Sequence, residues 1–230
     1  TVFSAYNQEH FSAHVSYSNM LDNINSVVQY EGINRTTNLY NSNFADESFS
    51  TNLRFGKTFA SYYKFNAGAS LNLLKNNVIQ INPATNEGNE ISRESINQHY
   101  SLGFRTNYKE LPNLEIAYSI LINKYPEETF YNSSPKAVLD YYFLNSFSLT
   151  ADYTFNTYQN KSKTINDSYD FFNASLAYHK KSSKWEYRIS ATNILNTKTL
   201  NSDHFSQFNI ATSRYQIQPR YVIASLKYNI

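Results

Sequence analysis

The sequence predicts an all-β fold, specifically a transmembrane antiparallel up-and-down β-barrel, and three observations support this prediction. Apolar and polar residues alternate one by one along most of the 230 residues, as expected where successive side chains point to opposite faces of a strand. Short turn-like connections alternate with long polar ones, which is the layout of outer-membrane barrels. Aromatic residues make up 17% of the chain, and many stand near the ends of the predicted strands, where such barrels carry aromatic girdles.

The alternation is clearest at 147–156, where one parity is apolar and the other is small and polar. The apolar positions are Phe147, Leu149, Ala151, Tyr153 and Phe155. Helical spacing fits such segments poorly. The same pattern predicts about ten strands, at 10–30, 35–59, 62–82, 92–108, 113–123, 129–143, 147–159, 168–180, 185–195 and 213–230.

The connections between these strands are of two kinds. Four are short, at 56–61, 109–113, 144–146 and 180–184, and four are long and polar, at 82–92, 124–135, 160–167 and 196–212. In an outer-membrane barrel the short turns face the periplasm and the long loops face the exterior. No linker divides the chain, so residues 1–230 are predicted to form one barrel segment without a plug domain.

Composition excludes several other classes of protein. The chain has no cysteine, which excludes disulfide frameworks, thiol catalysis and cysteine metal sites. It has no run of 18 apolar residues, so no transmembrane helix is predicted. The net charge is only +2 and the charges are interspersed, which gives no basis for binding nucleic acid.

A soluble β-sandwich is the main structural alternative, because its strands also alternate. The predicted strands are long, several exceeding fifteen residues, whereas sandwich strands usually have about five or six. Arg, Lys, Asp and Glu also stand in mid-strand on the polar parity, next to turns too short to cover them. These features favour the membrane barrel, in which such residues face a wet or plugged lumen.

The mid-strand charges share the polar parity of their strands and are predicted to face the lumen. A charge on the lipid face would cost about 2–4 kcal/mol at the membrane midplane. Arg105 and Glu115 flank one short turn, and Glu186, Arg188 and Lys227 form a second group. The predicted lumen-facing charges are Arg54, Lys64, Arg105, Glu115, Asp152, Glu186, Arg188 and Lys227. They could pair with one another, hold a plug or line a ligand path.

The last strand has the features of a barrel-assembly signal. Its apolar face consists of Val222, Ala224, Leu226, Tyr228 and Ile230. An alternating terminal strand of this kind is what barrel-assembly machinery commonly recognises, although Ile230 stands where Phe is usual. Any lipid-facing last strand would share the alternation, and both interpretations require a barrel.

The C-terminal region resembles a known family. The segment 191–196 reads ATNILN, and a long loop leads from it to the segment 215–221, which reads YQIQPRY, and to the final strand. This arrangement resembles the last hairpin of TonB-dependent outer-membrane receptors, in which an Asn-(Leu/Ile)-(Phe/Leu)-Asn turn ends the penultimate strand and a Pro-Arg pair precedes the last. The resemblance is best over 140–230, where Asp152-Tyr153 and the segment 169–175 (YDFFNAS) also resemble receptor strands.

The resemblance implies a barrel of about 22 strands with a plug inside, of which this chain would be the C-terminal part. It also implies a short N-terminal segment, preceding this chain, that meets the TonB energy-transducing protein. A barrel of ten strands closed on itself remains an alternative.

Ligand and catalytic residues are harder to predict. Aromatic rings in the predicted loops could stack on a carbohydrate or siderophore, which makes Tyr125, Tyr131, Phe205 and Phe208 candidates for ligand binding. His204 and Asp203 share the last long loop, but no catalytic motif or carboxylate pair is present. We therefore expect no enzyme activity, no metal and no cofactor, and the acidic loop residues have no ligand spacing.

The predicted function is TonB-coupled uptake of a large, scarce solute, such as a siderophore or glycan, across the outer membrane of a Gram-negative cell. The alternatives are a non-transporting barrel subunit of an outer-membrane complex and a small outer-membrane enzyme of the protease type. The expected partners are outer-membrane lipid, the barrel-assembly machinery, the TonB system through the preceding N-terminal part, and a surface lipoprotein.

Overall fold

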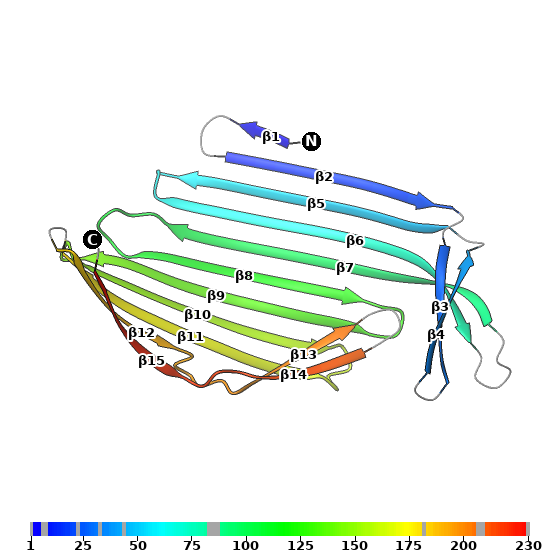
Figure 1. Cartoon of the computed structure of the whole chain (residues 1–230). Helices are drawn as coiled ribbons and strands as arrows, with labels where there is room; N and C mark the ends of the chain where they lie inside the picture. The colour runs from blue at the N-terminus through cyan, green and yellow to red at the C-terminus, as the bar shows by residue number, and fades with distance from the viewer. Residues whose placement is uncertain are drawn as a thin grey trace.

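The computed structural model describes residues 2–5, 9–21, 24–31, 34–42, 45–81, 88–180, 183–205 and 210–228. Eleven strands of this part form one antiparallel sheet in the order β1-β2-β5-β6-β7-β8-β9-β10-β11-β12-β15 (Figure 1). Each strand of the sheet is followed by its neighbour in space, apart from the two places where a separate hairpin intervenes. The predicted all-β, antiparallel up-and-down fold is therefore confirmed.

The strands of the main sheet are long in its centre and shorter at its sides. Their bounds are β1 Val2–Ala5, β2 Glu9–Met20, β5 Asp46–Phe59, β6 Tyr63–Ile81, β7 Gly88–Thr106, β8 Asn113–Lys124, β9 Thr129–Phe143, β10 Phe147–Asn160, β11 Asn166–His179, β12 Trp185–Thr192 and β15 Tyr221–Tyr228. The longest pair, β6 and β7, has 19 residues in each strand.

Two further hairpins leave the main sheet at the same end. β3 (Ile24–Glu31) pairs only with β4 (Asn34–Asn41), and β13 (Thr199–Phe205) pairs only with β14 (Ile210–Gln216). Figure 1 shows both hairpins at the end where β2 finishes and β5 begins. We call this the long-loop end, and the end that carries the connections at 60–62, 107–112, 144–146 and 180–184 the short-turn end.

Two connections at the short-turn end are three-residue hairpin loops, since Phe59 pairs with Tyr63 and Phe143 pairs with Phe147. Ala60 and Ser61 have φ of 46° and 62°, and Leu144 and Asn145 have φ of 50° and 54°. The first two residues of each loop thus have positive φ, a conformation that residues other than glycine rarely adopt. The Tyr62 N–H donates to the Phe59 carbonyl at 3.1 Å, and the Ser146 N–H donates to the Phe143 carbonyl at 3.3 Å.

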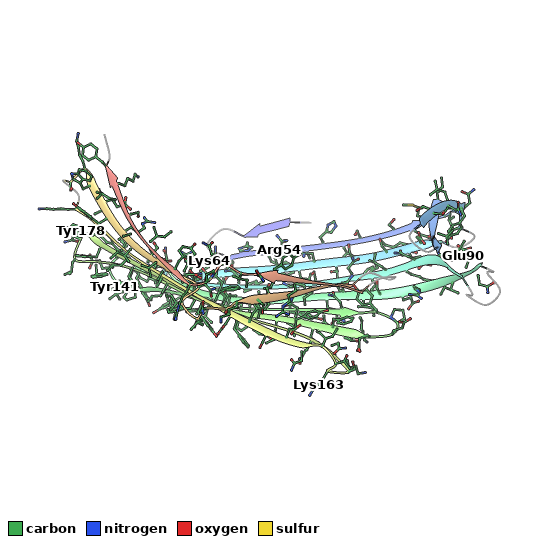
Figure 2. All side chains as sticks on the ribbon, turned by 60° about the horizontal axis from the view of Figure 1, so that its bottom comes forward. Arg54, Lys64, Glu90, Tyr141, Lys163 and Tyr178 are labelled. Atoms are coloured by element: carbon green, nitrogen blue, oxygen red, sulfur yellow. The ribbon has the colours of Figure 1, made fainter. Side chains whose placement is uncertain are left out.

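The main sheet is a single curved layer, as Figure 2 shows with side chains on both faces. Within the described part of the chain, the only buried hydrophobic residues are Phe130 and Ala177, at 4% and 8% exposure. A sandwich would bury one face of each sheet against the other. Here no second sheet covers the large one among the described residues, so the sandwich alternative is wrong.

Several predicted strand limits are also wrong. The segments 10–30 and 35–59 are not single strands, since β2 ends at Met20 and the small hairpin β3-β4 precedes β5. Part of the predicted long loop 82–92 belongs to a strand, because β7 begins at Gly88, whereas the strand predicted at 129–143 coincides with β9 and the overlapping loop prediction 124–135 is too long. β12 ends at Thr192 rather than 195, and the predicted loop 196–212 contains β13. At the start of β7 and in β13 polar residues stand on both faces of the strand, so the alternation that reveals a strand is lost there.

The sheet is curved but open in this part of the chain. Its order begins at β1 and ends at β15, and these two strands do not pair with each other. Ten of the eleven strands correspond to the ten predicted ones, and β1 is an additional strand of four residues. The described residues contain no helix with the length and apolar character of a membrane span.

Candidate functional site

Strand register places the predicted lumen charges on one face of the sheet. Lys64 stands opposite Arg105, which stands opposite Glu115 on the next strand. The register of the other strand pairs places all eight predicted lumen charges on this same face, which we call the polar face. They are Arg54, Lys64, Arg105, Glu115, Asp152, Glu186, Arg188 and Lys227. Whether the polar face encloses a lumen stays a prediction.

Ion pairs on the polar face gather on β7 to β9 and on β12. Glu115 lies between two cations, 3.9 Å from the Arg105 guanidinium and 3.6 Å from the Lys136 ammonium group. On β12, the Arg188 guanidinium donates to the Glu186 carboxylate at 2.9 Å, and Lys227 is the register partner of Glu186 on β15. Exposed pairs of this kind contribute little stability, about 0–1 kcal/mol each.

The opposite face of the same strands is apolar and uncovered. Leu102, Ile116, Ile189 and Val222 are 54%, 52%, 58% and 69% exposed. A water-soluble domain rarely leaves a continuous apolar face of this extent uncovered. We call this surface the apolar face; it requires an apolar surrounding.

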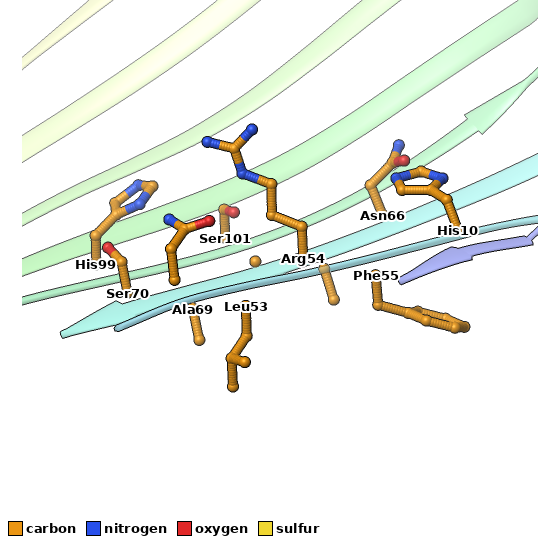
Figure 3. Close-up of a pocket in the computed structure, with 12 residues that line it drawn as sticks. His10, Leu53, Arg54, Phe55, Asn66, Ala69, Ser70, His99 and Ser101 are labelled. Atoms are coloured by element: carbon orange, nitrogen blue, oxygen red, sulfur yellow. The ribbon is translucent and has the colours of Figure 1, made fainter. Parts of the chain in front are cut away.

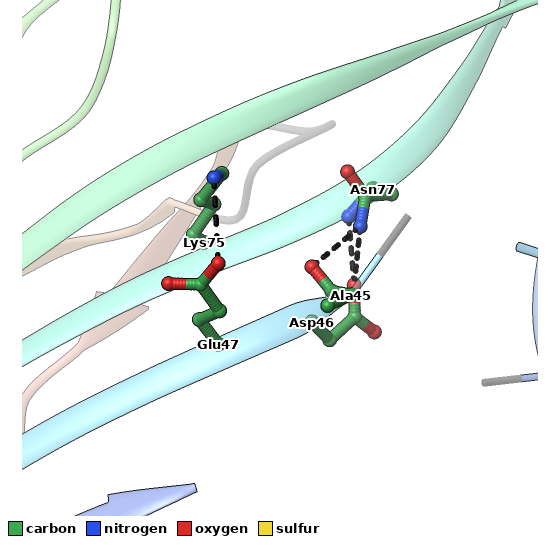
Figure 4. A network of polar contacts seen from close by, with 5 residues as sticks. All are labelled: Ala45, Asp46, Glu47, Lys75 and Asn77. Carbon is green, nitrogen blue, oxygen red and sulfur yellow. Dashed lines mark hydrogen bonds and ion pairs between the residues drawn. The ribbon is translucent and has the colours of Figure 1, made fainter. Parts of the chain in front are cut away.

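Charged residues mark both borders of the apolar face on β5 and its neighbours. Toward the long-loop end, the Lys75 ammonium group lies 3.5 Å from the Glu47 carboxylate (Figure 4). Glu94 is the register partner of Lys75 on the next strand. Toward the short-turn end, Lys57 pairs with Glu9. From Glu47 to Lys57 the strand covers about 33 Å at 3.3 Å per residue. Tilted by about 40°, it would cross about 25 Å, the height of the apolar band of an outer-membrane barrel.

An almost continuous row of aromatic rings lies at the short-turn end of the apolar face. Phe147 contacts Phe143 and Tyr178, with ring centroids 5.4 and 4.8 Å apart. Trp185 contacts Tyr228 at 4.7 Å. Further along the row the Tyr108 hydroxyl donates to the Tyr63 hydroxyl at 2.7 Å, a hydrogen bond that raises the pKa of Tyr108. Rings with one apolar and one polar side are typical of the boundary between lipid and water.

At the long-loop end, the connections 125–128 and 161–165 are joined by side chains around Glu128. The Ser162 hydroxyl and the Asn160 amide donate to one Glu128 oxygen at 2.6 and 3.1 Å, and the Thr129 N–H donates to the other at 3.0 Å. The Ser162 hydrogen bond is the main reason that the pKa of Glu128 lies below its ordinary value. Asn160 is 4% exposed and also donates to Thr164 at 2.7 Å.

The motif that carries the family resemblance forms a hydrogen-bonded turn. Asn193 and Asn196 have φ of 52° and 59°, a conformation that asparagine tolerates better than most residues. The Asn193 side chain, 2% exposed, donates to the carbonyls of Thr197 and Gln218 at 2.9 and 3.0 Å. The Asn193 N–H donates to the Asn173 side chain at 2.9 Å. One asparagine thus joins β11, the end of β12 and the approach to β15.

A second buried amide serves the same purpose between β5 and β6. The Asn77 side chain donates to the Ala45 carbonyl and to an Asp46 oxygen, both at 3.0 Å, and its N–H donates to the same oxygen at 2.9 Å (Figure 4). Asn77 is 3% exposed. Nothing in the sequence distinguishes this residue or Asn160, because isolated asparagines are common in this chain and carry no motif.

The predicted ligand-binding aromatics do not form one site. Tyr125 lies in a loop and contacts the Phe130 ring at 6.1 Å, and burial raises its pKa. Tyr131 lies in β9 and not in a loop, and Phe205 is the last residue of β13, so both predictions of a loop position are wrong. Phe208 lies outside the described residues.

The other predicted site residues are scattered. His204 and Asp203 are successive residues of β13, and their side chains lie outside the described part. Among the described residues no group of three or more metal-ligating side chains occurs. In β15, Leu226 and Tyr228 lie on the apolar face, 58% and 48% exposed, while Ile230 lies outside the described residues.

Comparison with known proteins gives a distant likeness to two solved structures. The chain is similar to OmpT, an outer membrane protein of Vibrio cholerae folded in vitro, with 10% identity and a TM-score of 0.46 over 83% of this chain and 65% of that chain. It is also similar to the toluene transporter TodX of Pseudomonas putida, with 13% identity and a TM-score of 0.31 over 100% of this chain and 72% of that chain. The chain thus spans less than two thirds of the first structure. No family model and no curated protein matches the sequence.

Proposed function

We propose that the chain is part of the wall of an outer-membrane transport barrel, with the apolar face against lipid and the polar face lining a water-filled lumen. The observation that carries this proposal is that one face of the curved sheet suits lipid and the other suits water. Apolar side chains are uncovered on one face, and on β2, β5 and β6 the charges between the two charged borders are confined to the other. In a membrane, only closed sheets satisfy all their backbone hydrogen bonds.

The two sides of the sheet support a barrel larger than this segment. β1 and β15 are its outermost strands and do not pair with each other. An edge strand in lipid would leave a row of backbone groups without hydrogen bonds. Each edge therefore requires a further strand, which favours a larger barrel over one closed by these strands alone.

The resemblance to TonB-dependent receptors makes the proposal more specific: energy-coupled uptake of a large, scarce solute such as a siderophore or a glycan. Its support is the Asn193–Asn196 turn, which is followed by Pro219-Arg220 and the last strand of the sheet. The Arg220 N–H donates to the Asn196 side chain at 3.2 Å, so the turn and the approach to the last strand are in contact. The proposed partners are lipid, the barrel-assembly machinery, the TonB system and a surface lipoprotein.

Paired single-cysteine variants test which face meets lipid and which meets water. Because this chain contains no cysteine, Leu102→Cys and Ser101→Cys place one thiol on each face of β7, on adjacent residues. In the full-length protein in membranes, a water-soluble maleimide should label the Ser101→Cys variant and leave the Leu102→Cys variant unlabelled. A lipid-soluble maleimide should label the Leu102→Cys variant. Equal labelling of both variants by the water-soluble reagent would exclude a lipid-facing apolar face.

A transport assay tests the more specific part of the proposal. Cells with and without the full-length protein should differ in uptake of a radiolabelled ferric siderophore or a fluorescent oligosaccharide, and a protonophore should abolish the difference. Uptake that depends on the protein but not on the proton gradient would exclude TonB coupling and keep the barrel. If deletion changes no uptake and the protein copurifies with an outer-membrane complex, the subunit alternative is correct.

A further inference from the structure

The charges of the polar face are divided unequally between its two halves. On β2, β5, β6 and β7 the polar face carries four cationic side chains and three histidines. They are Arg54, Lys64, Arg93, Arg105, His10, His14 and His99. Among the described residues of these four strands, the only carboxylate on this face is that of Asp46, at the long-loop end. From β8 to β15 the same face carries Glu115, Asp140, Asp152, Asp167 and Glu186 among three cations and one histidine, His179. We call the first half the basic half and the second the acidic half.

Arg54 stands in the basic half, away from any carboxylate. It faces Ser12 on one side and Gly68 on the other, and the next residue in the row is Ser101. In the described part of the chain Arg54 makes no ion pair, and its side chain is exposed. An arginine without a counter-ion, surrounded by small neutral residues, can bind an incoming carboxylate or phosphate through two parallel hydrogen bonds.

The surface around Arg54 is hollowed because neighbouring residues are small. A hollow of about 340 Å³ is lined by Arg54, His10, His99, Asn66, Ser70 and Ser101 among others. Figure 3 shows these side chains on one side of the sheet, with Leu53 and Phe55 on the other. A Cβ on Gly68 would lie 2.7 Å from the Ser101 hydroxyl, and a Cβ on Gly56 would overlap the His10 ring. Glycine at these two positions leaves room for the hollow and for His10.

A second feature of the basic half also indicates a missing anion. Lys64 and Arg105 are direct partners across β6 and β7, and like charges opposite each other destabilise a sheet. Glu115 compensates Arg105 only at 3.9 Å and is shared with Lys136. Lys64 makes no ion pair within the residues that the structure describes. The basic half therefore carries an excess of positive charge that bound anions would neutralise.

We propose that the hollow around Arg54 binds the carboxylate or phosphate groups of an anionic solute on its way through the barrel. The inference rests on the proposed function and names the chemical class of its substrate. Arg54 supplies the fixed charge and the bidentate donor. Asn66, Ser70 and Ser101 supply neutral hydrogen-bond donors, and the imidazoles of His10 and His99 stand at two sides of the hollow.

The test uses cysteine labelling with reagents of opposite charge in the full-length protein in membranes. Ser101→Cys places a thiol in the hollow, and Ser175→Cys is the matched control in the acidic half, on the same face. The rate of labelling by a negatively charged methanethiosulfonate, relative to its positively charged analogue, should be about fivefold higher in the Ser101→Cys variant than in the control. Millimolar citrate or pyrophosphate should slow the labelling of the Ser101→Cys variant about threefold, while sodium chloride of equal ionic strength should not.

Adding Arg54→Gln to the Ser101→Cys variant should abolish protection by citrate and pyrophosphate, and adding Arg54→Lys should retain part of it. Far-UV circular dichroism confirms that each variant keeps its β-structure. Equal charge preference in the Ser101→Cys and Ser175→Cys variants, or protection unaffected by Arg54→Gln, would overturn the anion site. If neither thiol reacts with any water-soluble reagent, the polar face is not wet, and the proposed function itself is wrong. The two failures are therefore distinguishable.

Discussion

At the short-turn end, Ala60-Ser61 and Leu144-Asn145 take positive φ in three-residue hairpin loops. On the long-loop side of the sheet, Asn160 at the end of β10 and Asn193 just after β12 instead connect segments through buried side-chain amides. Backbone geometry determines the strand connections at the first end, and aromatic rings cover it. Side-chain hydrogen bonds hold the second end, where loops meet. The two ends of one sheet can therefore be held by different kinds of interaction, and mutations at each end should change the free energy of unfolding by different amounts.

The largest effect is expected from Asn193→Ala, on the long-loop side of the sheet, just after β12. It removes the hydrogen bonds to the carbonyls of Thr197 and Gln218 and leaves these groups without that donor. The free energy of unfolding in lipid vesicles should fall by about 2–3 kcal/mol, as measured by urea unfolding of the full-length protein. Asn145→Ala, at an exposed turn of the other end, is the control and should change it less. Equal losses would remove the distinction between the two ends.

A smaller loss is expected from Phe147→Leu in the aromatic row. This variant keeps an apolar side chain but loses the ring contacts with Phe143 and Tyr178, which are worth about 0.5–1.5 kcal/mol each. Phe155→Leu is the matched control on the same strand and face, since Phe155 has no ring contact among the described residues. Urea unfolding should show a loss of about 1–2 kcal/mol only for Phe147→Leu. A similar loss for both would mean that the row acts through apolar area alone.

A gain in stability is expected from Leu144→Gly. Leu144 has φ of 50° and is 76% exposed, so it holds a left-handed conformation that glycine adopts without steric cost. The free energy of unfolding should rise by about 0.5–1 kcal/mol, because the relief of this cost exceeds the extra backbone entropy that glycine loses on folding. Leu144→Ala removes the exposed side chain and keeps the steric cost, so it should change little. Stabilisation by both variants would assign the effect to the leucine side chain and not to the turn.

The smallest effect concerns acid and the Glu128 cluster. Because Glu128 has a lowered pKa in the folded protein, its ionised form stabilises the fold above the ordinary glutamate value of 4.5, and this contribution is lost as the pH falls through the lowered pKa. Urea unfolding between pH 3 and 7 should therefore show a steeper acid loss for the native protein than for Glu128→Gln. Ser162→Ala should lessen the dependence, since it removes the main hydrogen bond. An unchanged slope in both variants would show that the cluster does not hold the loops.

Sequence reasoning identifies the strands but not what joins them. The alternation in the segment 147–156 predicts β10, because a strand with one face against an apolar surrounding needs an apolar residue at every second position. Beyond the apolar face this demand ends, so the sequence predicts a loop where β7 begins, at Gly88. The shared face of Arg105 and Glu115 follows from parity, whereas the hollow around Arg54 depends on register between four strands, which one sequence does not specify.

The charged borders of the apolar face have a consequence for where the protein can reside. Glu47 and Lys75 at one border and Glu9 and Lys57 at the other leave β5 little freedom to slide along the membrane normal. A bilayer with a hydrocarbon core much thicker than about 25 Å would bury one of these ion pairs, and adaptation of the lipid costs fractions of a kcal/mol per Å of mismatch. Hydrophobic thickness would thus select the membranes that accept this sheet, with thin ones preferred over sterol-rich thick ones.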